Sequence, residues 1–279
     1  FPTIGSMRLS EIEPRHIADV LRPIWLAKPE TASRLKQRLH AVLSWGWAHG
    51  HCAANAVDVV HHLLPQQPGK AIRTQHQPAM PWRTIPEFIK TQLRKSKHHD
   101  QTHPLLELLI LTAARSGEIR GMRWNEVDTE GAIWTIPADR MKAGLPHRIP
   151  LSKRAMEILE AQKGLHEDLV FPSPRDQVVL SDMVLTSFLR RVKATSDSPG
   201  RIATAHGFRS SFRDWCSEQG YPRDLAERAL AHTISNKVEA AYHRTDLLEQ
   251  RRSMMVAWAL YCGSALGNNN LAEEPNLVA

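Results

Sequence analysis

The sequence predicts a mainly α-helical protein with a small antiparallel β-sheet, divided into two domains. Its 279 residues are more than one compact core usually holds. Apolar residues recur at helical spacing along most of the chain, and the period changes to that of strands only over 132–138 and 147–152. With 42% apolar and 23% charged residues, the composition excludes a disordered or fibrous protein.

Residues 1–66 are expected to form a small helical domain. Glu13 precedes Pro14, the usual order of an N-cap and a first helical residue, so the first helix should begin there. Thr31 is the expected cap of the second helix. Each helix has one apolar face, formed by Ile17, Val20, Leu21 and Ile24 in the first and by Leu35, Leu39, Val42 and Leu43 in the second.

The net charge of +7 favours an anionic partner such as nucleic acid. Residues 67–103 carry 7 basic and 2 acidic side chains, whereas residues 104–279 carry 22 of each. The Pro-rich start of the basic stretch, 67–82, is the expected linker between the domains. An ordinary solvated surface explains these charges equally well. The candidate DNA contacts on the second helix and around the linker are Arg34, Lys36, Arg38, Lys70, Arg73 and Arg83.

Residues 83–262 are expected to form the larger domain, and residues 263–279 a flexible C-terminal tail. The segment 105–114 is apolar nearly all round, which predicts a helix buried at the centre of this domain. Ser116 should cap a short helix after it. Two strands joined by a turn with Gly144 follow. Helices are then expected over 153–163, 181–193, 204–219, 222–231, 235–242 and 246–261.

The sequence lacks the features of several other protein classes. No apolar run is long enough to cross a membrane, and no signal peptide is seen. Cys52, Cys216 and Cys262 form no Cys-x-x-Cys pair, so we expect no disulfide scaffold or thiolate zinc site. The histidine pairs 61–62 and 98–99 lack ligand spacing, which disfavours a metal enzyme, and no P-loop is present. We therefore expect no metal, no cofactor and a cytoplasmic location.

Residues with chemistry-bearing side chains follow one another in a particular order of types. An HxxR pair, a hairpin lysine or a tyrosine near the C-terminus is usually structural when it occurs alone. The order Arg, Lys, His-x-x-Arg, His, Tyr, with its flanking apolar patterns, is much more specific. The residues are Arg115, Lys142, His206, Arg209, His232 and Tyr242.

At these positions the sequence resembles the tyrosine recombinase (phage integrase) family, in particular the integrases of prophages and genomic islands. The matching segments include TAARSGEIRGMRW, MKAGLPHRIPLS, AHGFRSSF and the segment of Tyr242. The resemblance implies a two-domain clamp, with residues 1–66 as a helical core-type DNA-binding domain and residues 83–262 as a mixed α+β catalytic domain. Longer members carry a further N-terminal domain for arm-type sites, and no segment here corresponds to it.

The resemblance also implies how DNA would be cut. The Tyr242 hydroxyl would attack a phosphodiester and form a 3′-phosphotyrosine, with His206 as its base. Arg115 and Arg209 would clamp the phosphoryl oxygens with permanently charged, bidentate donors. Lys142 would protonate the departing 5′-hydroxyl.

Further roles and partners follow from the same resemblance. His232 would donate a hydrogen bond to a non-bridging oxygen, and Glu118 would orient the site. Double-stranded DNA is the expected substrate, with DNA-bending or directionality factors as possible accessory partners and no membrane partner. In related recombinases the C-terminal segment docks on a neighbouring subunit, so the apolar face of 251–261 is expected to link a tetramer. Packing of that face on its own domain is the alternative.

Two other functions stay open from the sequence. A type IB topoisomerase resembles this class in its tyrosine nucleophile and its arginine, lysine and histidine helpers. An integrase relative that binds DNA without catalysis would share the same fold.

Overall fold

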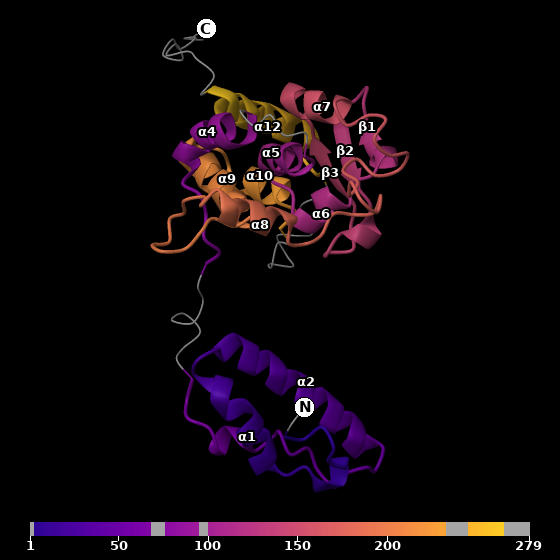
Figure 1. The fold of residues 1–279 in the computed structure, drawn as a ribbon, viewed down its shortest axis with the longest axis vertical. Helices are drawn as coiled ribbons and strands as arrows, with labels where there is room; N and C mark the ends of the chain where they lie inside the picture. The colour runs from indigo at the N-terminus through magenta and orange to yellow at the C-terminus, as the bar shows by residue number, and fades with distance from the viewer. Residues whose placement is uncertain (1–2, 68–75, 95–99, 233–244, 265–279) are drawn as a thin grey trace. The chain divides into compact units, whose positions relative to one another are not determined.

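Contacts within the chain divide it into two compact units, residues 1–76 and residues 77–279. This division falls inside the stretch predicted as a linker. No helix among the described residues is long and apolar enough to cross a membrane. The structure is a computed structural model, and it describes residues 3–67, 76–94, 100–232 and 245–264 (Figure 1).

The first unit is built on two helices that pack against each other, α1 (Pro14–Trp25) and α2 (Pro29–Ala48). Helix α1 begins as predicted, with Glu13 as N-cap and a proline at the first helical position. Short 3₁₀ turns lie over Leu9–Glu11 and Val60–His62. The core of the unit is formed by apolar side chains that include Ile17, Leu21, Leu43, Val57 and Val60.

Two details of α2 were predicted wrongly. The helix begins at Pro29, before Thr31, because a proline fits the first turn, where no N–H is needed. Val42 is 55% exposed and lies outside the buried face, which passes through Ala32 and Leu43. The expected helix and its general apolar face are confirmed, while its start and one of its core residues are corrected.

The second unit consists of helices with a small sheet at one side (Figure 1). A π-helical turn over Ile89–Arg94 continues the first of these helices. Short 3₁₀ turns cover Trp82–Thr84, Trp124–Glu126 and Ala138–Arg140. The helices are α4 (Ile85–Phe88), α5 (Thr102–Thr112), α6 (Ser116–Arg120), α7 (Lys153–Glu160), α8 (Val184–Arg191), α9 (Gly207–Glu218), α10 (Arg223–Ala229) and α12 (Leu248–Gly263).

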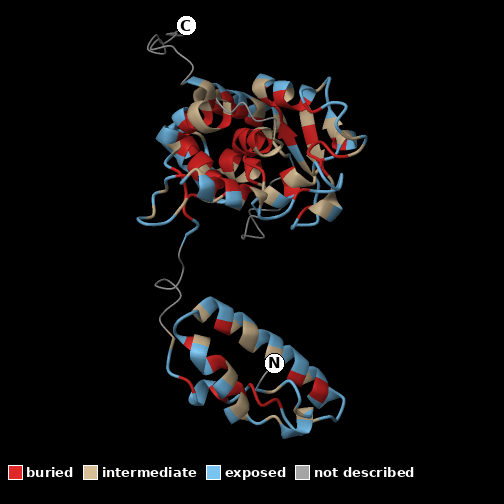
Figure 2. Ribbon diagram, in the orientation of Figure 1, coloured by how far each residue is buried: buried red, intermediate tan, exposed pale blue. Residues whose placement is uncertain are grey.

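Helix α5 lies at the centre of this unit, as its all-round apolar sequence predicted. Every residue from Leu105 to Thr112 is at most 3% exposed, and helices α6, α7, α8, α9 and α12 contact it. Figure 2 shows α5 as a buried helix enclosed by its neighbours. The helices predicted after residue 152 are confirmed with ends displaced by a few residues, and the one over 235–242 lies outside the described residues.

The sheet has three antiparallel strands in the order β1 (Val127–Asp128), β2 (Ile133–Ile136) and β3 (His147–Pro150). In the register of β2 and β3, Trp134 faces Ile149, and both side chains are buried. The hairpin was predicted, but β1 was not, because two residues are too few to show a strand period.

The apolar face of α12, for which docking on a neighbouring subunit was expected, packs within its own unit. Met254, Met255 and Trp258 are at most 2% exposed and belong to the core of their own unit, so the docking interpretation of this face is wrong. The Trp258 Nε1–H donates to the Ile110 carbonyl on α5 at 2.8 Å. The sequence left packing on its own domain as the alternative, because α5, the partner of this face, lies about 150 residues earlier and no sequence period links the two.

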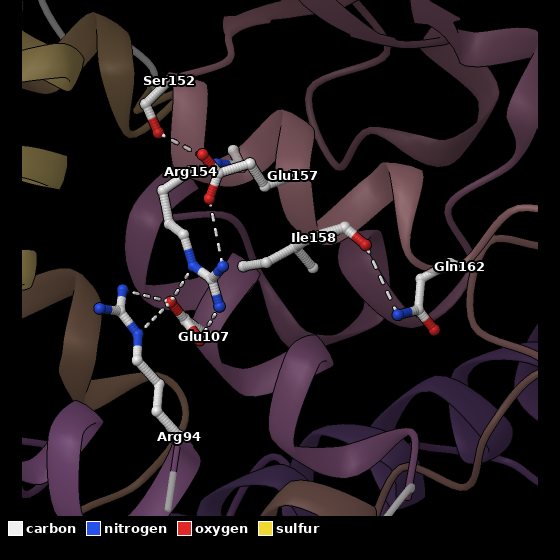
Figure 3. Close-up of polar contacts among 8 residues, drawn as sticks. Arg94, Glu107, Ser152, Arg154, Glu157, Ile158 and Gln162 are labelled. Carbon is white, nitrogen blue, oxygen red and sulfur yellow. Dashed lines mark hydrogen bonds and ion pairs between the residues drawn. The ribbon is translucent and has the colours of Figure 1, made fainter.

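The buried helix α5 carries one carboxylate, Glu107, which is 3% exposed (Figure 3). Arg94 Nη2 lies 2.6 Å and Arg154 Nε 2.8 Å from its Oε1. Burial alone would raise the pKa of Glu107, but hydrogen bonds and charge attraction from Arg154 and Arg94 outweigh it and lower the pKa below its ordinary value. The three side chains tie the π-helical turn and α7 to the central helix.

Candidate active site

Arg115 is held at the junction of α5 and α6. Ala113 ends α5 in the left-handed conformation, at φ 50°, and Arg115 is the N-cap of α6. The Glu118 carboxylate accepts from the Arg115 backbone N–H at 2.8 Å and from its Nη1 at 2.8 Å. The cap was predicted at Ser116, which is instead the first helical residue. Glu118, expected to orient the site, therefore fixes both the backbone and the guanidinium of Arg115.

Arg209 projects from the first turn of α9 into the interior and is only 4% exposed. Its Nη1 donates to the Ala113 carbonyl and its Nη2 to the Leu230 carbonyl, both at 2.5 Å. Burial first, and then repulsion from Arg115, lowers the pKa of Arg209 to about 10, so the group is still charged at neutral pH. Within the described residues no carboxylate forms an ion pair with it. The site thus contains a buried positive charge suited to an anion.

Consecutive carbonyls at the C-terminal end of α10 hold side chains from three different elements. His147 Nε2 on β3 donates to the Ala229 carbonyl at 3.3 Å. Arg209 donates to the carbonyl of Leu230, the next residue, and Arg115 Nη2 donates to the Ala231 carbonyl at 3.3 Å. The carbonyl end of a helix attracts positive charge. The end of α10 is therefore the point at which the two arginines are brought together.

The two histidines of the predicted set lie beside this arginine pair. His206 precedes the first residue of α9. Its pKa is lowered by burial and by the charges of Arg209 and Arg115, which favours the neutral form that accepts a proton. His232 Nδ1 lies 2.5 Å from a Glu227 carboxylate oxygen. Arg213 contacts the other oxygen of that carboxylate at 2.8 Å.

A glycine between His206 and Arg209 allows α9 to start where it does. A Cβ on Gly207 would overlap the Pro78 carbonyl oxygen and come within 2.8 Å of the Ala79 Cα. Only a residue without a side chain lets the helix approach this backbone so closely. Because of this close approach, the first turn of α9, which carries Arg209, lies in the interior of the unit.

The other two predicted catalytic residues are not seen in this cluster. Lys142 lies in the exposed loop between β2 and β3, and the described residues show no contact between it and the arginines. Tyr242 lies outside the described residues. Three further residues that contact this cluster were missed by the sequence analysis: His147, Arg213 and Glu227. Glu227 precedes His232 by five residues, and His232 lies beyond the end of α10, so no helical pair spacing in the sequence indicated this contact.

The candidate DNA contacts differ in their surroundings. Arg34 is exposed but pairs with Glu30 at 3.2 Å, and Arg38 is exposed, whereas Lys36 is half-buried. Arg83 pairs with Glu218 and lies over the Trp82 ring. These residues stay predictions, and Lys70 and Arg73 lie outside the described residues.

His147 gives the fold a specific pH dependence. The pKa of His147 is lowered from 6.5 to about 4, mainly by burial and next by the positive charge of Arg251. The charge of Arg209 lowers this pKa further, whereas the charge of Glu118 raises it. An unfolded chain binds this proton below pH 6.5, and the folded chain does not until about pH 4. We expect the free energy of unfolding to fall by about 2 kcal/mol from pH 7 to pH 5.

Urea unfolding at the two pH values measures this effect, with His147→Gln as the comparison, because glutamine keeps a donor and does not titrate. The variant should lose about 2 kcal/mol less than the wild type over the same interval. Equal losses in the two proteins would contradict the assignment.

Among the described residues, no three histidine, cysteine or acidic side chains gather as they would around a metal ion. Comparisons with known proteins match a different family model to each of the two units. A model of the "Phage integrase family" matches residues 82–248, and a model of the "Phage integrase central domain" matches residues 1–62.

Curated relatives are similar along nearly the whole chain. The prophage integrase IntA of Escherichia coli K12 is 31% identical over 93% of this chain, and the integrase of Enterobacteria phage P4 is 31% identical over 94%. The alignments cover 61% and 62% of those proteins. The chain therefore spans about three fifths of the length of these relatives.

Solved structures share the fold. A lambda integrase (75–356) dimer bound to a COC′ core site has a TM-score of 0.62 at 19% identity, covering 84% of this chain and 83% of that one. A lambda integrase tetramer bound to a Holliday junction has a TM-score of 0.57 at 20% identity, covering 85% and 65%. The Tn1549 transposon integrase in complex with circular intermediate DNA has a TM-score of 0.58 at 12% identity, covering 90% and 87%.

Proposed function

Since the chain belongs to the phage integrase family, we propose that it is a site-specific recombinase that cuts and rejoins DNA through a 3′-phosphotyrosine intermediate. The observation that best supports this proposal is the pair of guanidiniums of Arg115 and Arg209, which carbonyls at the end of α10 hold side by side. Arg209 has no carboxylate partner among the described residues. Integration and excision of a mobile element are the reactions that this chemistry serves.

The arginine pair is suited to the charge of the transition state. When a phosphodiester is attacked, negative charge grows on its non-bridging oxygens, and fixed donors aimed at those oxygens lower the barrier most in a site with little water. Hydrogen bonds from both Nη atoms fix the position of Arg209. Glu118 fixes Arg115 in the same way, so neither side chain has to reorganise during the reaction.

Proton transfers complete the proposed reaction. Tyr242 attacks the phosphorus while His206, favoured in its neutral form, takes the phenol proton. Lys142 gives a proton to the departing 5′-hydroxyl. His232, oriented by Glu227, donates to a non-bridging oxygen. A 5′-hydroxyl of a second DNA strand then displaces the tyrosine and restores a phosphodiester.

The partners follow from the relatives. We propose double-stranded DNA as the substrate, with the first unit contacting the core site, and assembly of several copies on DNA, as in the dimer and tetramer of lambda integrase. DNA-bending or directionality proteins are proposed as accessory partners. Its place of action would be the bacterial cytoplasm, on the nucleoid.

A nicked suicide substrate carrying the junction DNA of the element tests this function. The small fragment beyond the nick is lost after cleavage, so the covalent protein–DNA adduct accumulates and is seen on a denaturing gel. We expect the adduct to form equally in EDTA, because arginines rather than a divalent ion neutralise the phosphate. Cleavage that disappears in EDTA and returns with magnesium would contradict the proposal. Relaxation of plasmid DNA without joining of two sites would favour a topoisomerase.

A further inference from the structure

Arginine side chains bind Asp246, a few residues after the proposed nucleophile. Arg148 on β3 forms a bidentate pair with the Asp246 carboxylate, with Nε at 2.9 Å and Nη2 at 2.8 Å. Arg251 on α12 donates from Nη2 to the same carboxylate at 3.0 Å and from Nε to the Asp246 carbonyl at 2.6 Å. Asp246 is thus bound through its side chain and its backbone by two different elements.

The arginines that hold Asp246 belong to rigid parts of the fold. Arg148 is on β3, in register with β2, so the sheet fixes its backbone. Arg251 is 1% exposed, and its Nη1 donates to the Arg148 carbonyl at 2.6 Å. Asp246 is the member of the cluster that sits outside regular structure, before α12 begins at Leu248. Loss of its carboxylate would therefore release the segment at Asp246 more than the strand or the helix.

A third arginine ties the same segment to the active site. Arg228 on α10 donates to the Thr245 carbonyl. The carbonyls of the next three residues, 229 to 231, are those that hold His147, Arg209 and Arg115. The anchored segment and the arginine pair are thus attached to the same end of α10.

Chain length limits how far the nucleophile lies from this anchor. Tyr242 precedes Asp246 by four residues, and an extended residue spans at most about 3.5 Å, so the two Cα atoms are separated by at most about 14 Å. Residues 245 and 246 are held by arginines of α10, β3 and α12, so the chain that leads to the nucleophile starts from a fixed point. Restricting a reacting group to the right region supplies a large part of enzymatic rate enhancement.

We infer that Asp246 is a positioning residue for cleavage, which acts by anchoring the downstream end of the segment that carries Tyr242. This inference rests on the proposed function. The two arginines also hold the pKa of Asp246 below its ordinary range despite burial, so the carboxylate keeps its charge throughout the neutral range.

The test compares Asp246→Asn with Asp168→Asn, a control in the ion pair of Arg123 and Asp168. The side chains of Arg148 and Asp246 are 47% and 40% exposed, and those of the Arg123–Asp168 pair are 44% and 45% exposed. Both variants remove one carboxylate charge from an arginine pair of similar exposure, but only Asp246 also pairs with a buried arginine, Arg251. We expect Asp246→Asn to cleave the suicide substrate about 10²-fold more slowly in a single turnover, with DNA affinity unchanged, and Asp168→Asn to cleave at nearly the wild-type rate. Asp246→Glu should recover part of the rate.

Equal cleavage rates in the two asparagine variants would overturn the inference. So would a loss of folded protein or of DNA binding in Asp246→Asn large enough to account for the slower cleavage, because the residue would then be only structural. Circular dichroism melting and a filter-binding titration of each variant provide these two measurements.

A second substrate separates the nucleophile from the leaving group. In a 5′-bridging phosphorothiolate the departing atom is sulfur, and a thiolate needs no protonation to leave. Lys142→Ala should recover its cleavage rate on this substrate, whereas Asp246→Asn should not. Recovery of Asp246→Asn would place its effect on the leaving group and overturn the inference. Failure of the wild type to form an adduct with either substrate would instead contradict the proposed function itself.

Discussion

Replacing Tyr242 with phenylalanine is expected to abolish the covalent protein–DNA adduct completely while DNA binding stays unchanged. The phenol oxygen is the only atom removed, and it is the atom that would form the bond to phosphorus. The aromatic ring is kept, so neither folding nor affinity for DNA should change. The measurement is adduct formation on the nicked suicide substrate, read on a denaturing gel, beside a filter-binding titration with the same DNA.

The chain contains two other tyrosines, Tyr221 and Tyr261, which serve as matched controls. Burial raises the pKa of both phenols, which makes them poorer nucleophiles. Tyr261 also donates to the Trp82 carbonyl at 3.4 Å and packs against the Trp258 ring. Phenylalanine at either position should leave adduct formation intact. An adduct that persists in Tyr242→Phe and is lost in one of these controls would assign the nucleophile elsewhere.

Replacing Arg209 with lysine is expected to reduce the single-turnover cleavage rate by about 10²–10³-fold. The guanidinium spans two carbonyls, those of Ala113 and Leu230, and still has N–H groups left for a phosphate. A lysine has one point charge on a flexible stem, so it cannot bridge both carbonyls and donate to an oxygen in the same plane. Because the charge is kept, ground-state DNA affinity should change far less than the rate.

Arg154→Lys is the control for the effect of losing a partly buried arginine fork. Arg154 donates to Glu107 from two nitrogens, as Figure 3 shows, and it lies in the contact between α7 and the central helix rather than among the active-site residues. This variant should lose stability but retain its cleavage rate per folded molecule. A similar fall in rate for both variants would show that the arginine of α9 acts through stability and not through the phosphate.

Much of the fold was predictable because it depends on local patterns. The all-round apolar segment around Leu105–Thr112 has to be enclosed by other elements, and it is the central helix. Pro14 marks the start of α1 because its ring suits the first helical turn. The prediction failed where local rules compete. Thr31 is a good cap, but Pro29 starts the helix earlier. The exposure of Val42 reflects which side of α2 meets the rest of its unit.

The site was predictable as a set of residue types but not as an arrangement. Arg115, His206, Arg209 and His232 are brought together, and Glu118 orients the first of them. The sequence did not indicate that carbonyls at the end of α10 hold both arginines, because backbone carbonyls have no residue-specific pattern. Asp246 was missed for a related reason: its partner Arg148 is 98 residues away, so no helical or strand spacing connects the two.

By itself, the sequence determined the mainly helical class, the position of the buried helix, the hairpin and the ordered set of chemically active side chains, because periodicity and residue type are local properties of a chain. The tertiary structure alone decided that α12 is part of its own core. It also decided that Arg209 is buried without a carboxylate partner among the described residues, and that arginines of β3, α10 and α12 hold residues 245 and 246. The physical reason is that burial and charge pairing depend on which distant segments meet.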